Sequence, residues 1–119
     1  MKIDYNQKLK SLSGKELKDN QTNEDLCLKD VCANALLGLF DDERKLEGKE
    51  KLRRYQLANK IYGAKEPIEL KSEEITLLKT LVSKAYAALI SGQVWKILDP
   101  AEKAEPEQKE PKKIIPGGN

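Results

Sequence analysis

The sequence contains no histidine, and its 119 residues include only two cysteines. Without an imidazole, a Ser–His or Cys–His nucleophile system and a histidine-bound metal are both excluded. Cys27 and Cys32 stand at a spacing that matches no zinc site. Lysine or carboxylate chemistry stays open, but no paired acids stand in an apolar context. We therefore expect no metal, no cofactor and no enzymatic activity, with both cysteines as free thiols in a reducing compartment.

The chain also lacks a long hydrophobic run and a strong excess of charge. Its longer apolar runs, such as Ala85–Ile90, are far too short to span a bilayer, and Met1–Tyr5 lacks the apolar region of a signal peptide. Charged residues make up 35% of the sequence, but the formal net charge is only +2. No strong global field therefore draws the chain to nucleic acid or to an anionic membrane. We expect a soluble cytoplasmic protein with no membrane partner.

The strongest pattern in the sequence runs from Ser72 to Leu98. Its apolar residues recur at three- and four-residue steps, which places them on one face of a helix; they are Ile75, Leu78, Val82, Ala85 and Leu89. Ser72 is the expected N-terminal cap. Gly92 interrupts the pattern, so we expect a bend at Ser91–Gly92 and a last short helix over Gln93–Leu98. This long helix is predicted to be the centre of a small core.

Two further helical stripes precede it. The first predicts a helix from about Lys29 to Phe40, and its apolar face comprises Leu28, Val31, Cys32, Ala35, Leu36 and Leu39. The second predicts a helix over Gly48–Tyr62, which Gly63 ends and Pro67 cannot continue. The residues expected to face inward on this second helix are Leu52, Tyr55, Ala58, Ile61 and Tyr62.

The two ends of the chain differ from this helical part. A glycine turn at Ser13–Gly14 predicts a small N-terminal β-hairpin with Leu12 and Leu17 on one face. Residues 99–119 are rich in Pro, Glu and Lys and have the composition of a disordered tail. The expected fold is mostly α with a minor β part: a compact domain of three to four helices over residues 1–98, followed by the tail.

Two sets of residues are candidates for binding. The partner-binding candidates are Trp95, Val94, Tyr55 and Tyr62, since tryptophan and tyrosine are enriched in protein interfaces. For Trp95 two readings stay open: it closes the bottom of the core, or it anchors an interface. The nucleic-acid candidates are Lys49, Lys51, Arg53, Arg54 and Lys60. Glu47 and Glu50 partly neutralise this set, so a solvated helix face is favoured over a nucleic-acid groove.

Four stretches carry a resemblance to known sequences: Leu28–Val31 with Asn34–Leu37, residues 52–62 (LRRYQLANKIY), Glu74–Ile75 with Leu78–Lys79, and Gly92–Trp95. Over residues 7–98 the chain resembles small, uncharacterised bacteriophage or prophage accessory proteins. The resemblance implies a bacterial cytoplasm and a small accessory role. The function that we expect is a non-catalytic protein–protein interaction module, such as a phage assembly or host-modulating factor, with self-association left open. The alternative is weak nucleic-acid binding through the basic face of Gly48–Tyr62.

Overall fold

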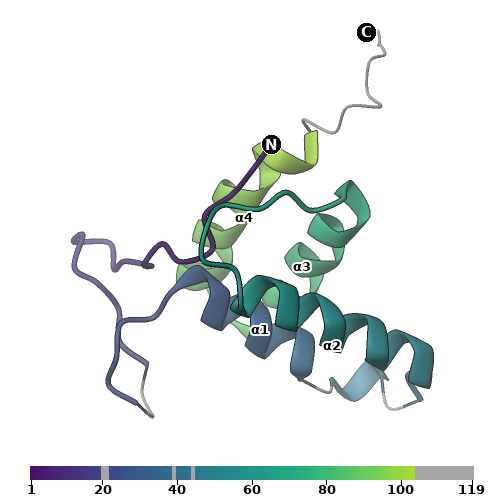
Figure 1. Ribbon diagram of the computed structural model, residues 1–119. Helices are drawn as coiled ribbons and strands as arrows, with labels where there is room; N and C mark the ends of the chain where they lie inside the picture. The colour runs from purple at the N-terminus through teal and green to yellow at the C-terminus, as the bar shows by residue number, and fades with distance from the viewer. Residues whose placement is uncertain (20–21, 39, 44, 104–119) are drawn as a thin grey trace, which may run out of the picture.

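The computed structural model describes residues 1–19, 22–38, 40–43 and 45–103. Four α-helices follow one another along this part of the chain (Figure 1): α1 (Leu28–Leu37), α2 (Gly48–Tyr62), α3 (Ser72–Ala85) and α4 (Ala88–Lys103). A short 3-10 helix, Asp41–Glu43, lies between α1 and α2. Helix α1 packs against both α2 and α3, and α3 packs against α4. The predicted mostly helical fold is confirmed.

The core forms between α1 and α3, with α2 packed on α1 and α4 packed on α3. Leu28, Val31, Cys32, Ala35 and Leu36 of α1 are buried, as the stripe predicted, whereas Leu39 lies outside the described residues. Helix α3 adds Ile75, Leu78, Leu81 and Val82, and α4 adds Val94, Leu98 and Ala101. Burial raises the pKa of the Cys32 thiol to about 12. Cys32 therefore behaves as a small apolar side chain.

The start of α3 differs from the prediction in its cap. Lys71, not Ser72, is the N-cap residue, and Ser72 is the first residue inside the helix. The Glu74 side chain reaches back, and its Oε1 accepts a hydrogen bond of 2.8 Å from the Lys71 backbone N–H. A glutamate three residues into a helix can satisfy a free amide in this way without a serine or threonine cap.

The long central helix is broken in a different place from the one predicted. Helix α3 ends at Ala85, Tyr86 is extended (φ −131°, ψ 153°), and α4 runs without interruption through Gly92. Tyr86 is partly buried against the core, and its hydroxyl oxygen accepts a hydrogen bond of 3.3 Å from Asn34 Nδ2 on α1. Packing at Tyr86 therefore sets the turn, whereas a side chain added at Gly92 would meet open space. Leu89, expected on the buried stripe, is exposed.

The last turn of α4 passes the expected end of the domain at residue 98. Pro100 lies inside the helix, Ala101 is buried, and Glu102 accepts hydrogen bonds from Lys79 and Thr76 on α3. These contacts hold the final turn against α3, so the boundary predicted at residue 98 is too early. The rest of the predicted tail, residues 104–119, lies outside the described part of the chain.

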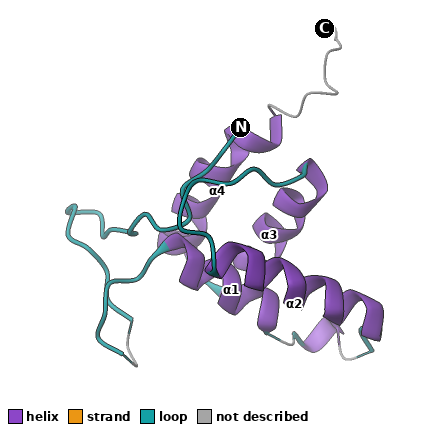
Figure 2. Cartoon of the chain, in the orientation of Figure 1, coloured by secondary structure: helices purple, strands orange, loops and turns teal. Residues whose placement is uncertain are grey.

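The N-terminal region contains no strand among the residues that the structure places (Figure 2), so the predicted hairpin is not confirmed. Short antiparallel bridges pair Lys8 with Cys27, Lys10 with Glu16, and Lys18 with Asp25. Leu12 is 97% exposed, so it does not share a buried face with Leu17.

Three leucines tie these bridges together. The N–H of Leu9 donates to the carbonyl of Leu26 (2.9 Å), that of Leu26 donates to Leu17 (2.8 Å), and that of Leu17 donates to Leu9 (3.0 Å). We call this set the leucine ring. Its backbone hydrogen bonds connect the three bridges. Residues 6–10, which include Leu9, lie beside α4.

Candidate protein-binding surface

Helix α2 presents three different faces because it packs mainly against one neighbour, α1. The buried face carries Arg54, Leu57, Ala58 and Ile61. The prediction of an inward position is therefore right for Ala58 and Ile61. It is wrong for the three larger side chains, since Leu52, Tyr55 and Tyr62 are 55%, 56% and 54% exposed. At 100° per residue these three positions fall on a second face of the helix, beside the buried one.

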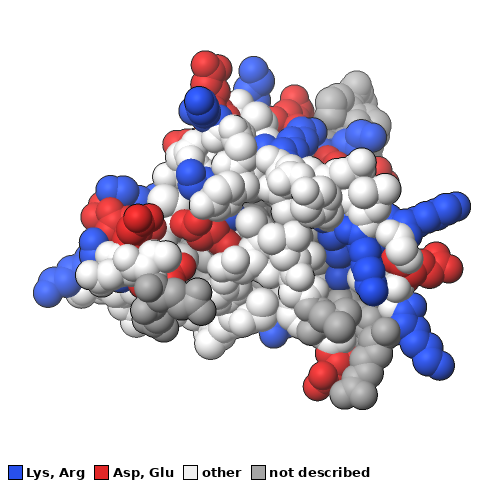
Figure 3. Space-filling model, turned by 60° about the horizontal axis from the view of Figure 1, so that its bottom comes forward, with Lys and Arg blue, Asp and Glu red and all other residues white. Residues whose placement is uncertain are grey.

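This second face borders a groove between α1 and α2, which we call the tyrosine groove. Its volume is about 330 Å³, and its lining residues are Ala33, Asn34, Leu37, Tyr55, Ala58, Asn59 and Tyr62. Leu37, at the end of α1, is 59% exposed. The view from the α1–α2 end of the molecule (Figure 3) shows a broad uncharged area, with lysine and arginine side chains gathered at one edge. Exposed apolar surface of this kind marks interaction sites in proteins.

A lysine from α1 contributes to the edge of the tyrosine groove. Lys29 Nζ lies 5.0 Å from the ring centroid of Tyr62, within the range of a cation–π contact. The contact places a positive charge beside one of the two tyrosines. Neither Lys29 nor Leu37 was among the residues predicted to form a site. The separate stripe of Leu52, Tyr55 and Tyr62, at steps of three and seven residues, was the sequence signal for this surface.

The five predicted basic residues do not form one surface. Lys49, Arg53 and Lys60 share an exposed strip, the third face of α2. Arg53 pairs with Glu50 at 3.2 Å. Arg54 is only 5% exposed, and its Nε lies 3.2 Å from Glu50 Oε2, so it holds α2 together internally and offers no surface to a phosphate.

Lys51, the fifth of the set, lies apart from the strip. It lines a smaller hollow of about 230 Å³ together with Leu36, Leu37 and Leu46. Leu37 lines both this hollow and the tyrosine groove, so Lys51 lies nearer to the tyrosine groove than to the basic strip. Only three of the five predicted residues therefore remain together.

Trp95 combines both readings that the sequence left open. It is 43% exposed, yet its Nε1–H donates to Ser83 Oγ (2.8 Å) and to the Lys79 carbonyl (3.1 Å) on α3. The ammonium of Lys79 lies 4.4 Å from the ring centroid. Trp95 thus closes the seam between α3 and α4 while one part of its ring stays open to solvent. Val94 is fully buried, so it belongs to the core and offers nothing to a partner.

Lys79 is buried at the centre of this seam. Its Nζ lies 2.8 Å from a carboxylate oxygen of Asp99 and 2.8 Å from one of Glu102. Burial alone lowers the pKa of an ammonium, but the two carboxylates outweigh it and raise the pKa of Lys79. The same contact, with a hydrogen bond from Thr76, lowers the pKa of Glu102. The cluster links α3 to α4.

Similarity to known proteins adds nothing to this geometry. No protein-family model matches the chain, no curated protein is significantly similar to it, and no solved structure matches it significantly. Within the ranges that the structure describes, no three acidic, cysteine or histidine side chains are grouped so that they could hold a metal ion. None of the helices in those ranges is long and apolar enough to cross a membrane. The tyrosine groove is therefore the candidate site that the predicted residues support.

Proposed function

We propose that this protein is a non-catalytic protein–protein interaction module that binds its partner through the tyrosine groove. One observation carries the proposal: three large side chains, each more than half exposed, line one groove in a small domain. They are Leu37, Tyr55 and Tyr62. Tyrosine is enriched among the residues that dominate binding energy, because it buries a large rigid ring and keeps a polar tip. The groove would take an apolar side chain of the partner between the two rings.

The resemblance to bacteriophage proteins supports a more specific proposal about context. An accessory factor in phage assembly or in modulation of the host would act by contact alone, in the bacterial cytoplasm. A protein of this size with an exposed tyrosine groove suits such a role. The identity of the partner is the subject of the experiment.

A photo-crosslinking residue placed at Tyr55 tests the proposal directly. We expect irradiation in bacterial cells to yield a crosslinked product of defined mass, and Tyr62→Ala in the same chain to reduce its yield at least tenfold. The matched control places the crosslinker at Thr80, an exposed residue of α3 that lines neither this groove nor any other that the structure describes. Equal products from both positions, or no product from Tyr55, would contradict the proposal. A product of twice the monomer mass would identify the partner as a second copy of the chain.

A second candidate function, weak binding of single-stranded nucleic acid, has one observation in its favour. Lys49, Arg53 and Lys60 share one exposed strip of α2, and basic side chains along one face suit a phosphate backbone. Fluorescence anisotropy with a labelled oligonucleotide tests it. Binding that falls steeply with salt, and that Lys60→Gln weakens, would favour this function. Crosslinking to protein at Tyr55 without oligonucleotide binding would exclude it.

A further inference from the structure

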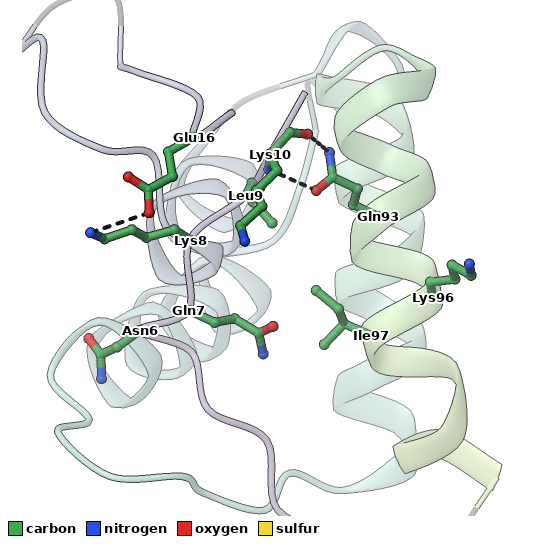
Figure 4. Close-up of a pocket in the computed structure, with 9 residues that line it drawn as sticks. All are labelled: Asn6, Gln7, Lys8, Leu9, Lys10, Glu16, Gln93, Lys96 and Ile97. Carbon is green, nitrogen blue, oxygen red and sulfur yellow. Dashed lines mark hydrogen bonds and ion pairs between the residues drawn. The ribbon is translucent and has the colours of Figure 1, made fainter. Parts of the chain in front are cut away.

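A second groove lies on another side of the molecule, between residues 6–10 and α4 (Figure 4). Its volume is about 660 Å³, and its two walls differ in kind. One wall is extended backbone, and the other is a helix that contributes Gln93, Lys96 and Ile97. We call it the edge groove. Figure 4 shows the side chains of Gln7 and Ile97 facing each other across it.

The hydrogen bonds of residues 6–10 show which backbone groups face the edge groove. The N–H of Leu9 donates to Leu26 (2.9 Å), and the N–H of Leu28 donates to the carbonyl of Gln7 (2.9 Å). In an extended chain the N–H and C=O groups of successive residues point to opposite sides. Gln7 and Leu9 thus use the side toward residues 26–28. The backbone groups of Lys8 and Lys10 point to the other side, toward α4.

At Lys10 a side chain of α4 already occupies the place of a neighbouring strand. The Lys10 N–H donates to Gln93 Oε1 (3.0 Å), and Gln93 Nε2 donates to the Lys10 carbonyl (2.7 Å). Figure 4 shows both bonds as dashed lines. A residue of an antiparallel strand exchanges the same pair of bonds with its neighbour. The Gln93 amide therefore imitates one residue of an added strand.

Beside Lys8, no side chain of the described residues takes the place of a neighbouring strand. Over the described part of the chain, neither the N–H nor the C=O of Lys8 has a hydrogen-bond partner. Lys8 lies about 7 Å from Lys10 along an extended chain, and Ile97 lies about 6 Å from Gln93 along a helix. The two walls therefore keep approximate register: Gln93 stands opposite Lys10, and the apolar Ile97 lies opposite residues 7 and 8. An apolar side chain cannot satisfy the backbone, so both groups are left free to bond an entering chain in place of water.

The charges around the edge groove favour an acidic occupant. Its lining contains three lysines, Lys8, Lys10 and Lys96, but a single carboxylate, Glu16. Lys8 pairs with Asp25 at 2.9 Å and lies 3.7 Å from Glu16. In the part of the chain that the structure describes, Lys10 and Lys96 have no ion-pair partner. Figure 4 shows Lys96 projecting away from the groove. Lys10 is therefore the lysine that a ligand would meet, at the end of the groove where Gln93 bonds to the Lys10 backbone.

We propose that the edge groove binds an extended, acidic segment of a partner protein by strand addition, with one residue of that segment exchanging two backbone hydrogen bonds with Lys8. An apolar side chain of the segment would rest on Ile97, and a carboxylate would lie beside Lys10. Backbone bonds supply affinity in this recognition mode, and the side-chain pockets and charges supply specificity. This surface is distinct from the tyrosine groove, and its occupancy does not depend on the function proposed for that groove.

Fluorescence anisotropy with three labelled peptides tests the proposal on the full chain. The probes are the acidic peptide EVTVEVE, the basic peptide KVTVKVK, and EVTVEVE with every second backbone nitrogen methylated so that one edge cannot donate. We expect the acidic peptide to bind at least tenfold more tightly than the basic one, and at least tenfold more tightly than the methylated peptide. Equal binding of all three, or no binding of EVTVEVE at millimolar concentration, would overturn the proposal.

Variants locate the peptide and separate the occupants. Lys10→Glu should weaken binding of EVTVEVE at least tenfold, whereas Lys15→Glu, an exposed lysine outside the groove, should leave it unchanged. Tyr62→Ala should also leave it unchanged, so a failure here and a failure of the tyrosine groove are told apart. A chain ending at residue 103 tests one other occupant. If it binds EVTVEVE at least tenfold more tightly than the full chain, residues 104–119 fill the groove, and the assignment to a partner protein is overturned.

Discussion

Replacement of Lys79 by methionine tests how the seam between α3 and α4 is held. The substitution keeps the length and apolar stem of the side chain but removes its charge. Three interactions are lost together: the contacts of Nζ with Asp99 and Glu102, both at 2.8 Å, and its cation–π contact with Trp95 at 4.4 Å. A mainly buried ammonium over a tryptophan contributes about 0.5 to 2 kcal/mol.

The two carboxylates contribute less than a fully buried ion pair. The side chains of Asp99 and Glu102 are 38% and 23% exposed, so water solvates them once the lysine is gone. We assign each contact about 0.2 to 1 kcal/mol, the range of surface pairs. The sum is a loss of about 2 kcal/mol in the free energy of unfolding. For a domain of this size that loss lowers the melting temperature by roughly 8 to 16 °C.

Thermal unfolding followed by circular dichroism measures this loss, and fluorescence reports on the same contact because Trp95 is the only tryptophan. Lys84→Met is the matched control, since Lys84 is on the same helix and pairs with the exposed Asp42. We expect a much smaller shift for the control. A Lys79→Met protein with the melting temperature and emission spectrum of the unchanged chain would refute the account of the seam.

The pH dependence gives the same prediction a second form. The pKa of Glu102 is lowered by Lys79, so its contribution to stability is complete above the ordinary carboxyl pKa and is lost as the pH falls through the lowered value. The pKa of Lys79 is raised, so its contribution is complete below the ordinary lysine pKa and is lost only as the pH rises through the raised value. The stability difference between the unchanged chain and Lys79→Met should therefore be largest near neutral pH and narrow in acid.

Three further substitutions or measurements probe the core and the groove. Leu36→Ala should lower the free energy of unfolding by about 2 to 5 kcal/mol, because Leu36 is 2% exposed. Leu37→Ala should leave the melting temperature nearly unchanged and reduce crosslinking at the tyrosine groove. Equal melting temperatures for the two variants would contradict the assigned faces. Tyr5→Phe should leave stability equal or raise it by up to about 1 kcal/mol, since the buried Tyr5 hydroxyl has no hydrogen-bond partner among the described residues; a clear loss in urea denaturation would reveal a partner. A thiol reagent should modify Cys27 but not Cys32 in the native protein and both in denaturant, because burial raises the Cys32 pKa to about 12; two fast native thiols would contradict the burial.

The helices could be predicted from the sequence where a single apolar stripe packs into the core. Residues 28–36 and Ile75 to Val82 behave in this way, and their periodicity located α1 within a few residues and α3 at its start. The pattern failed at Tyr86, because alanines, leucine and isoleucine continue a helical stripe on both sides of it. Only the packing of the Tyr86 ring, a contact between distant segments, shows where the chain turns. Local periodicity carries no information about such a contact.

The candidate surface was predictable in part for a similar reason. Tyr55 and Tyr62 were identified as partner-facing candidates and are indeed exposed, although they were also counted as core. Arg54 shows why the inward face was misjudged: a buried arginine paired with Glu50 takes a position where an apolar residue is expected. The edge groove had no sequence signal at all. The side chain that satisfies the backbone of Lys10 belongs to Gln93, more than eighty residues away.

The leucine ring has a consequence for how the first part of the chain opens. Leu9, Leu17 and Leu26 each donate one backbone bond and accept another, so the cycle closes on itself and has no terminal bond at which fraying could begin. Opening any one of the bonds requires its two neighbours to move. The three amides should therefore exchange their hydrogens with solvent through one shared opening event, at one common rate, as a cooperative unit does. A stretch of chain with no helix or strand would then show the exchange behaviour of a small folded element.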